Sequence, residues 1–537
     1  MPNLPKPFKI IDFNTLAKQY DEKVYDANQT GEYWPLIWKD NSKKNVAQET
    51  FGIYTAMGDV RQGTENYDGI FHESLATIGS VLGASLVGID KSNQGGENYV
   101  SMLQNYFNSE TKWDIIMNNT CPEVAQLGGG YARDWWYDVY PNLMYYAVAD
   151  FYPSIQGNDA ILKSIADKFY EANKVLNGNY SFSYFDYASM EAKKSWICTQ
   201  QDVAAGHAMV LYAAYQKFKD PKYLEGAKSS LEALLNQQDN YFYEILMPFG
   251  AYVAARLNAE EGTNYNFSKV LDWTFDGDSS CREGWGVIVD NWNGYDVSGI
   301  VGSTTHNGGF GFLMNTYDTM WPLVPMVRYD QRYASTIGKW MLNAANTSRL
   351  FYPNEIPDEH QTIPEEKKHT KGVIAYEGLI KKAHYPQYEH IKAPVAIGDG
   401  MHWNAKNPKV SQFSVYGSGH VGIAGAIISK TSVENILQLD LLATDFYKNK
   451  AFPSYLYFNP NASLKKVGIT IGAQKVDVYD TTKRAFIAKN VSGDFTFEIT
   501  AENASVLVFV PANAKISIKE GKLYGDDTVI DYRYELN

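Results

Sequence analysis

Four segments of this 537-residue chain combine carboxylates with aromatic residues, and an apolar stretch follows each of them: 128–138, 184–202, 240–244 and 275–309. Carboxyl groups in such surroundings can exchange protons with a bound molecule, and aromatic rings can hold the apolar face of a ring-shaped one. The candidate acid and base residues are Asp134, Glu191, Glu244, Glu283 and His306. The candidate binding residues around them are Arg133, Trp135, Trp136, Asp138, Trp285, Trp292, Tyr295, Asn307 and Tyr317.

These residue types predict acid–base chemistry on a carbohydrate. Hydrolysis of a glycosidic bond needs one carboxylic acid to protonate the leaving oxygen and a second carboxylate to act as base or nucleophile. Glu244 and Glu283 lie beside apolar or aromatic residues that disfavour the charged form, so either is expected to be the acid. Asp134 follows Arg133, which favours the charged form, and is expected to be the base. The carboxylates Asp134, Glu191, Glu244 and Glu283 are predicted to converge on one cavity lined by Trp135, Trp285, Trp292 and Tyr295.

Two other functions fit the same residues. In a polysaccharide lyase, Asn or His neutralises a uronate carboxylate and Tyr or His removes the C5 proton; His306, Asn307 and Tyr317 could supply these groups. A non-catalytic glycan-binding protein would use the aromatic residues without a poised acid pair. Asp134 and Asp138 could also serve only to compensate the dipole at a helix start. Unsaturated uronates, new reducing ends or neither product would distinguish the three functions.

Paired helices are predicted to position these segments. In the clearest pair, apolar residues of 202–218 share one helical face, and a second helix follows Asp220 as cap and Pro221 as first residue. Five pairs and one further helix approach the six pairs of a closed ring, and long Gly-, Trp- and Tyr-rich loops favour a ring over an open solenoid. The other pairs are expected at 71–107, 137–175, 245–273 and 312–341, and the further helix at 16–20.

After about residue 395 the apolar period changes from 3.6 to 2 residues. Short alternating runs separated by turn signals are typical of an antiparallel β-sandwich. The charged segment 351–395, rich in His, Lys and Glu, is expected to be a linker or a lid. The predicted fold is therefore mainly α with a β domain: an (α/α)6 toroid of helical hairpins over 1–394, followed by an antiparallel β-sandwich over 395–537.

This layout resembles bacterial six-hairpin carbohydrate-active enzymes, which include glycoside hydrolases, some of them directed at uronic acids, and toroid-type polysaccharide lyases. The resemblance is carried by paired helices with loops such as Arg133–Tyr137 and Arg282–Trp285, followed by a β-sandwich. It spans nearly the whole chain in architecture and assigns no individual catalytic residue. It implies a glycoside hydrolase acting on a poly- or oligosaccharide, which could contain uronic acids, with a lyase as the alternative.

Composition narrows the possible partners. The net charge of −13 argues against nucleic acid or an anionic membrane as partner, and no apolar stretch approaches 18 residues. Aromatic residues make up 14% of the chain, which suits carbohydrate recognition or an aromatic core. No cofactor is expected, and the oligomeric state stays open.

Three cysteines, Cys121, Cys198 and Cys281, are too few for a disulfide framework or a zinc site, and at most one disulfide can form. No metal is expected, because Asp276–Ser280 has the character of a solvated turn rather than a calcium loop. The start of the chain lacks a secretory apolar region. We expect a cytoplasmic protein, or a periplasmic or extracellular one whose signal peptide has been removed.

Overall fold

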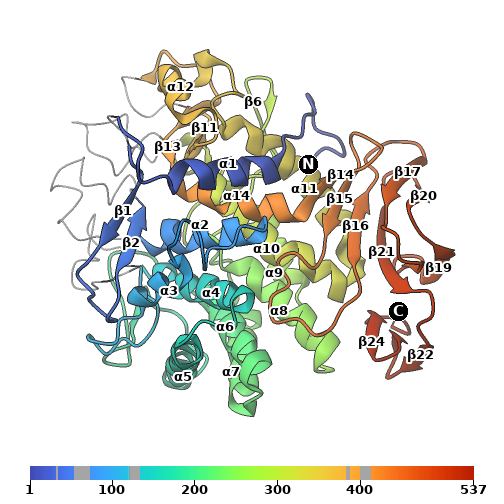
Figure 1. Ribbon diagram of the computed structural model, residues 1–537, viewed down its shortest axis with the longest axis horizontal. Helices are drawn as coiled ribbons and strands as arrows, with labels where there is room; N and C mark the ends of the chain where they lie inside the picture. Colours follow the sequence, from blue (N-terminus) through green and yellow to red (C-terminus); the bar gives the residue numbers. More distant parts are fainter. Residues whose placement is uncertain are drawn as a thin grey trace.

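The computed structural model consists of a helical part and a β part (Figure 1). Most helices gather on one side of the molecule, and the strands of the C-terminal segment stand on the other. Across the residues that the structure describes, no helix is long and apolar enough to cross a membrane. The described residues are 1–31, 34–53, 73–118, 120, 134–382, 388–398 and 413–536.

Six helices close into a ring. Each packs against the next, and the last packs back against the first. Most of their residues are buried, because ring neighbours and outer helices enclose them on all sides. In order around the ring they are α2 (Ser74–Leu86), α4 (Trp136–Phe151), α6 (Val203–Phe218), α8 (Met247–Glu260), α10 (Leu313–Tyr329) and α14 (Val415–Ile427). The predicted toroid of helices is confirmed.

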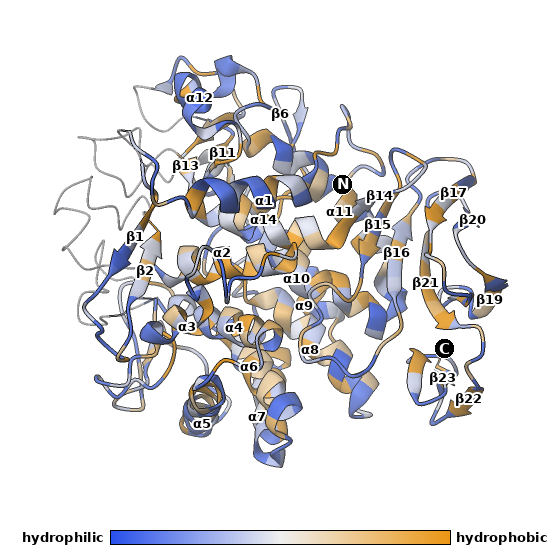
Figure 2. Ribbon diagram, in the orientation of Figure 1, coloured by the Kyte–Doolittle hydropathy of each residue, from blue (hydrophilic) through white to orange (hydrophobic). Residues whose placement is uncertain are grey.

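A second layer of helices packs on the outside of the ring. α1 packs on α14 and α2, α5 and α7 on α6, α9 on α8, and α11 on α10. As predicted, α7 begins with Pro221 after the cap Asp220, whose carboxylate accepts a 3.1 Å hydrogen bond from the Lys222 amide. Hydrophilic residues cover much of α5 and α7 (Figure 2). The outer helices are α1 (Phe13–Val24), α5 (Asn158–Leu176), α7 (Pro221–Leu235), α9 (Ser268–Asp276) and α11 (Ala334–Ser348).

The sixth ring helix, α14, lies in the segment for which the sequence predicts a β-sandwich. Its four glycines hide the helical period but allow close packing: a Cβ at Gly422 would lie 1.9 Å from the carbonyl oxygen of Gly83 in α2. The helix predicted alone near residues 16–20 is its outer partner, α1. The predicted start of the sandwich at residue 395 therefore differs from the structure, in which the first sandwich strand begins at Ile428.

Residues 285–397 contribute an antiparallel sheet that the sequence analysis missed. Its order is β12 (Val395–Ile397), β11 (Gly378–Ile380), β9 (Phe310–Phe312), β8 (Val301–Ser303) and β5 (Trp285–Val287). The prediction that 351–395 is a linker or lid is wrong for this part, since β11 is a buried strand of the sheet, paired with β12 on one side and β9 on the other. Strands of three residues are too short for a periodic signal amid charged neighbours.

Short elements complete the helical part. Two-stranded pairs are formed by β1 (Ile37–Asp40) with β2 (Thr50–Ile53), β3 (Tyr184–Asp186) with β4 (Glu191–Lys193), β6 (Asn291–Trp292) with β7 (Tyr295–Asp296), and β10 (Ala375–Tyr376) with β13 (Phe413–Ser414). Short helices are α3 (Tyr99–Met102), α12 (Lys367–Thr370), η2 (Leu103–Tyr106), η6 (His306–Gly308), η7 (Gln331–Tyr333), η8 (Arg349–Phe351), η9 (Asp358–His360) and η10 (Pro364–Glu366).

The C-terminal segment forms layers of antiparallel strands. A six-stranded sheet has the order β14 (Ile428–Lys430), β15 (Leu437–Asp440), β16 (Ser454–Phe458), β21 (Ala504–Pro511), β18 (Val476–Asp480) and β19 (Ala485–Val491). It is accompanied by the pair β17 (Lys465–Thr470) and β20 (Asp494–Ile499), and by β22 (Ile516–Lys519), β23 (Lys522–Gly525) and β24 (Thr528–Asp531). Tyr457 and Leu507 of the large sheet share an apolar core with Val467 and Phe497 of the pair, so the strands stack as the predicted sandwich.

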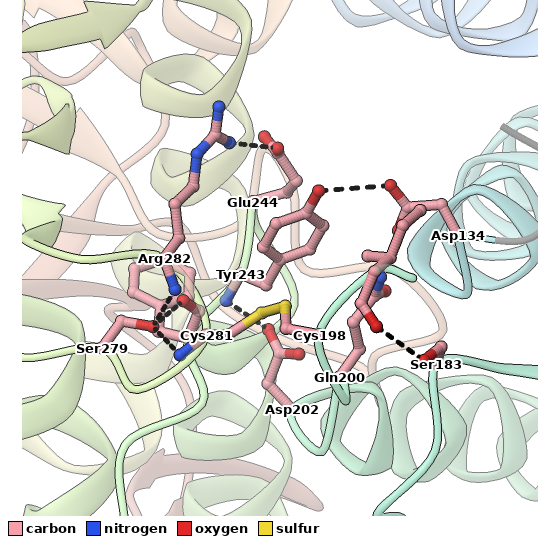
Figure 3. The surroundings of a disulfide bond; sticks show 12 residues. Asp134, Ser183, Cys198, Gln200, Asp202, Tyr243, Glu244, Ser279, Cys281 and Arg282 are labelled. Atoms are coloured by element: carbon pink, nitrogen blue, oxygen red, sulfur yellow. Dashed lines mark hydrogen bonds and ion pairs between the residues drawn. A yellow bond between two sulfur atoms is a disulfide. The ribbon is translucent and has the colours of Figure 1, made fainter. Parts of the chain in front are cut away.

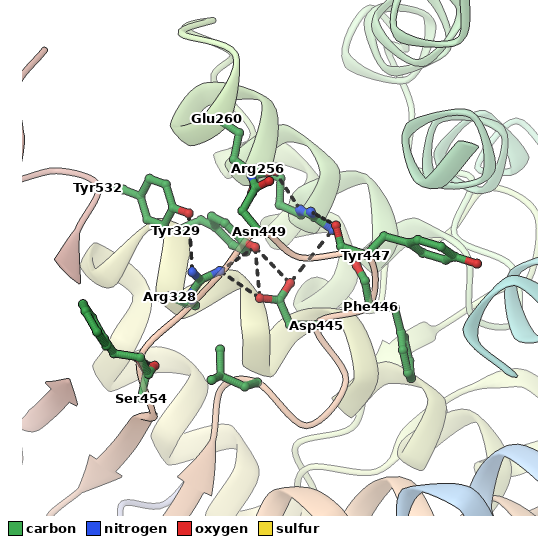
Figure 4. A network of polar contacts seen from close by, with 12 residues as sticks. Arg256, Glu260, Arg328, Tyr329, Asp445, Phe446, Tyr447, Asn449, Ser454 and Tyr532 are labelled. Carbon is green, nitrogen blue, oxygen red and sulfur yellow. Dashed lines mark hydrogen bonds and ion pairs between the residues drawn. The ribbon is translucent and has the colours of Figure 1, made fainter. Parts of the chain in front are cut away.

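A buried charged network ties the C-terminal ends of α8 and α10 to the loop that follows β15 (Figure 4). Arg328 donates to the carboxylate of Asp445 at 3.0 Å. Arg256 donates to the carbonyl oxygen of Phe446 at 2.9 Å and pairs with Glu260 at 3.1 Å. Because each charged group here has an opposite partner, the network can be buried without an isolated charge.

Candidate active site

At the other end of the ring, the segments before α4, α6 and α8 meet around Asp134 (Figure 3). Asp134 is 6% exposed and stands directly before α4. The side-chain amide of Gln200, before α6, donates to its Oδ1, and the Tyr243 hydroxyl, before α8, donates to its Oδ2 at 3.2 Å. Gln200 also accepts a hydrogen bond from the Trp136 amide at 2.9 Å, so its amide orientation is fixed from both sides.

Glu244, the residue after Tyr243, is held as a second carboxylate. Its backbone is in the left-handed region (φ 56°), which turns the chain into α8. Arg282 forms an ion pair with its Oε1, and Asn315, in the first turn of α10, donates to its Oε2 at 2.7 Å. The Arg282 guanidinium lies over the ring of Trp285, 4.2 Å from the ring centroid. Both oxygens of Glu244 are therefore fixed by donors.

The two carboxyl groups have opposite electrostatic surroundings. Burial raises the pKa of Asp134 to about 7, and the negative charge of Glu244 acts in the same direction, against the hydrogen bonds from Gln200 and Tyr243. Glu244 instead pairs with a cation. The sequence predicts that Asp134 stays ionised, whereas a pKa of about 7 leaves it only partly ionised at neutral pH, because burial opposes the charged form. Arg133, on which that prediction relied, lies outside the described residues.

A third carboxyl group, Asp202, belongs to the same cluster. Asp202 stands at the N-cap position of α6, but its Oδ2 accepts a 3.1 Å hydrogen bond from the Tyr243 amide instead of capping that helix. Burial raises the pKa of Asp202 well above its usual value, and the charges of Glu244 and Asp134 add to this effect. The site therefore favours protonated acids.

The other predicted acid and base residues are Glu191, Glu283 and His306. Glu191 is exposed on β4 and pairs with Lys193 at 3.2 Å. Glu283 is exposed, and its backbone carbonyl oxygen accepts a hydrogen bond from the Ser303 hydroxyl. Within the described part of the chain, no hydrogen bond or ion pair joins Glu191 or Glu283 to Asp134 or Glu244. His306 is half-buried, with its ring 5.7 Å from that of Phe310.

Most of the predicted aromatic platforms are core residues. Trp135, Trp285, Trp292 and Tyr317 are 0% exposed, and Trp136 is 3% exposed. The Trp285 indole donates to the Glu244 carbonyl at 3.2 Å, and the Tyr317 hydroxyl bonds that of Tyr352 at 3.2 Å. Trp135, Trp285 and Trp292, which were predicted to line the cavity, are instead packed in the core, Trp135 before α4 and the other two on the short strands β5 and β6. Tyr295 is half-buried against His360. Asp138 is buried in the first turn of α4, and the side chain of Asn307 lies outside the described residues.

Four residues that were not predicted as site residues hold the two carboxyl groups: Gln200, Tyr243, Arg282 and Asn315. The first three lie in segments that stand out in the sequence for carboxylates and aromatic residues, but no pattern there marks them as partners of a carboxyl group. Asn315 lies in a helix that was predicted only as apolar.

A disulfide between Cys198 and Cys281 lies beside the two carboxyl groups (Figure 3). It joins the loop before α6 to the loop that carries Arg282. The third cysteine, Cys121, lies outside the described residues. Among the residues with described positions, no group of three or more His, Cys, Asp or Glu side chains is placed to hold a metal ion.

No family model matches the sequence, and no curated protein matches it. Among solved structures, the chain is similar to a GH127 β-L-arabinofuranosidase from Geobacillus stearothermophilus T6, at a TM-score of 0.39 and 10% identity, covering 97% of this chain and 85% of that chain. It is similar to a second GH127 β-arabinofuranosidase, at a TM-score of 0.39 and 10% identity (96% and 80% covered), and to a glycoside hydrolase, at 0.37 and 10% (83% and 73% covered). The function proposed below rests on the geometry of the site.

Proposed function

We propose that this protein is a glycoside hydrolase acting on an oligo- or polysaccharide, with Asp134 as general acid and Glu244 as the second carboxylate. One observation carries the proposal: two buried carboxyl groups meet across Tyr243, one with a pKa raised to about 7 and the other paired with Arg282. Cleavage of a glycosidic bond requires two carboxyl groups, one protonated and one ionised, and their different surroundings set these two states.

Asp134 is suited to donate the proton. A carboxyl group whose pKa lies near 7 is partly protonated at neutral pH and can transfer its proton to the leaving glycosidic oxygen as the bond to C1 breaks. Gln200 and Tyr243 then donate hydrogen bonds to the carboxylate that remains. These donors stabilise the ionised form in a buried site, which lowers the barrier to the transfer.

Glu244 is suited to act as the base or the nucleophile. Arg282 and Asn315 hold one oxygen each, so the carboxylate is oriented before a substrate binds. As a base it would take a proton from water that attacks C1, and as a nucleophile it would attack C1 itself before water releases the sugar. Either route ends with a new hydroxyl group on each fragment.

Trp196 is a candidate platform for a sugar ring. It is 78% exposed, an unusual state for the largest aromatic side chain, and it lies two residues before Cys198 on the loop that leads to Gln200. A flat exposed indole can stack on the C–H face of a pyranose or furanose ring. The sequence analysis did not single out this residue.

The disulfide also supports a location for the protein. Disulfides form and persist in oxidising compartments and are rare in the cytoplasm. The Cys198–Cys281 bond therefore favours a periplasmic or extracellular protein over a cytoplasmic one.

The test is an activity screen followed by two variants. Glycans and aryl glycosides should yield new reducing ends without near-ultraviolet absorbance. Asp134→Asn and Glu244→Gln should each lower kcat by about 10²-fold or more, while Asp159→Asn and Glu171→Gln, which change exposed carboxylates, should retain activity. Unsaturated uronates would indicate a lyase, and binding without turnover would indicate a glycan-binding protein. Full activity of both site variants would overturn the assignment of the acid pair.

A further inference from the structure

The Cys198–Cys281 disulfide links two loops that are 83 residues apart in the sequence. Neither loop forms a helix or strand where the cysteines stand, and both cysteines are half-buried. In the loop before α6, Trp196 is 78% exposed and Gln200 is buried. A covalent link between the two loops limits how far they can move apart.

Each linked loop carries a residue that holds one of the two carboxyl groups. Gln200 lies two residues after Cys198 and donates to Asp134. Arg282 directly follows Cys281 and pairs with Glu244. The disulfide therefore connects the partner of one carboxyl group to the partner of the other (Figure 3).

Hydrogen bonds tie both loops to the segment that contains Tyr243 and Glu244. The Ser279 hydroxyl accepts from the amides of Cys281 and Arg282 at 3.2 Å and donates to the Phe242 carbonyl at 2.7 Å. On the opposite side, Asp202 accepts from the Tyr243 amide at 3.1 Å. Together the contacts link Asp134 to Gln200, the disulfide, Arg282, Glu244 and Tyr243, and Tyr243 contacts Asp134 again.

We propose that the Cys198–Cys281 disulfide is a positioning element of the acid pair: it fixes the placement of Gln200 and Arg282 and thereby the separation of Asp134 and Glu244. The proposal rests on the proposed hydrolase function for its effect on catalysis. Its effect on the surroundings of Asp134 is independent of any activity. A shift of about 1 Å in catalytic groups can lower a rate by about 100-fold, so a link that holds both partners should matter even when the fold survives its loss.

The link itself is tested by counting thiols. The unfolded, unreduced protein should show one reactive thiol out of three cysteines, and Cys198→Ser/Cys281→Ser should also show one. Peptide mass spectrometry should recover the Cys198–Cys281 pair from the native chain. Three reactive thiols in native protein purified under air would overturn the proposal.

The catalytic effect is tested in the Cys198→Ser/Cys281→Ser variant, with Cys198→Ala/Cys281→Ala as a second version and circular dichroism as the check on folding. We expect kcat to fall by about 10-fold and KM to change by less than about 3-fold. The alkaline limb of the pH–rate profile should also move to lower pH, because a loosened site hydrates Asp134 and lowers its pKa from about 7. A folded variant with the wild-type kcat and the wild-type alkaline limb would overturn the proposal.

A third measurement needs no substrate. The difference in Tm between native protein and Asp134→Asn, followed from pH 4 to 9, reports the pKa of Asp134 through linkage. The change with pH should level off near pH 7 in native protein and at a lower pH in the variant without the disulfide, because the upper end of the change marks the folded-state pKa. If this levelling-off point moves while the native protein cleaves no glycan, the hydrolase function fails and the positioning role stands. A levelling-off point that stays in place would overturn the positioning role.

Discussion

The helices α8 and α10 carry a buried charged cluster at each end, and the two clusters differ in their ratio of positive to negative groups. At the C-terminal ends, Arg256 and Arg328 meet two carboxylates, and nearly every donor has an acceptor (Figure 4). At the N-terminal ends, the described residues bring together three carboxyl groups, Asp134, Asp202 and Glu244, and one arginine, Arg282. Balanced charges hold elements together, whereas an excess of buried acid raises pKa values and leaves protons available for chemistry.

The two clusters also differ in role: the balanced cluster stabilises the fold, and the acidic cluster forms the candidate site. The balanced cluster joins the ring to the loop after β15, through Asp445 and the carbonyl oxygens of Phe446 and Tyr447. The acidic cluster joins the loops around Asp134 and Glu244 to the first turn of α10, and its burial disfavours the charged form of Asp134. Proteins commonly accept such a loss of stability where activity needs it. Breaking each cluster should therefore have effects of opposite sign on stability.

The largest effect is expected at the balanced cluster. Asp445→Ala leaves Arg328 without its carboxylate and removes the acceptor of the Tyr252 and Tyr329 hydroxyls, so unfolding should become easier by about 3–5 kcal/mol. Thermal or denaturant unfolding measures this loss. As a matched control, Asp527→Ala removes an exposed partner of Lys450 and should cost less than about 1 kcal/mol. Equal small losses in both variants would contradict the structural role of the cluster.

At the acidic cluster, Asp134→Asn should stabilise the protein above neutral pH. The pKa of Asp134 is about 7 in the folded state and near 3.8 when unfolded, so the folded state binds more protons between these values and stability falls as pH rises through them. Above pH 7 the buried carboxylate is charged, and the neutral amide removes that penalty, by roughly 1–2 kcal/mol. Melting curves at pH 5 and pH 8 measure the difference. A destabilised variant at pH 8 would contradict the raised pKa.

A third buried pair, between the two ends of the ring, should also lose stability as pH rises, but at pH values above 6.5. His420 Nδ1 lies 2.6 Å from an Asp318 oxygen, and its Nε2 lies 3.0 Å from the Leu75 carbonyl. Burial lowers the pKa of His420, but the Asp318 charge outweighs it, so the pKa is raised overall. The stabilisation is fully present below pH 6.5 and is lost as pH rises through the folded pKa.

His420→Gln tests this directly. The substitution removes the charge but keeps a donor, so the variant should lose stability at pH 5.5 and lose less at pH 9. Urea unfolding at the two pH values measures the change. A loss that is equal at both pH values would mean that His420 is neutral in the folded protein.

The sequence predicted those parts of the fold that leave a periodic signal. Hairpins such as α6 and α7 have amphipathic or apolar faces. Asp220 was predicted as the cap of α7, and its carboxylate does accept a hydrogen bond from a backbone amide of the first turn. The helix α14 was missed because glycines replace the side chains that would mark a helical period. The strands of the 285–397 sheet were missed because each is too short for alternation to appear.

The candidate site was predicted less well, for a physical reason. The segments containing Asp134 and Glu244 stand out by composition, but which of their side chains meet depends on how four helix starts pack together. Burial decided the protonation of Asp134 against the expectation from its charged neighbour in sequence. Tryptophans look like sugar platforms in a sequence, yet Trp135 and Trp285 are core residues.

The smallest effect is expected for an aromatic residue at each end of the ring. Trp196 is 78% exposed on the loop beside the acidic cluster, whereas Phe151, 40% exposed at the end of α4, packs its ring 5.7 Å from that of Phe446 beside the balanced cluster. If Trp196 stacks on a sugar ring, Trp196→Ala should raise KM by about 3- to 10-fold with kcat nearly unchanged, because stacking stabilises the bound ground state and the transition state alike. Phe151→Ala should leave KM unchanged and lower Tm slightly. Steady-state kinetics on the same glycan measures both variants, and a KM for Trp196→Ala equal to that of Phe151→Ala would show that the exposed indole does not contact the substrate.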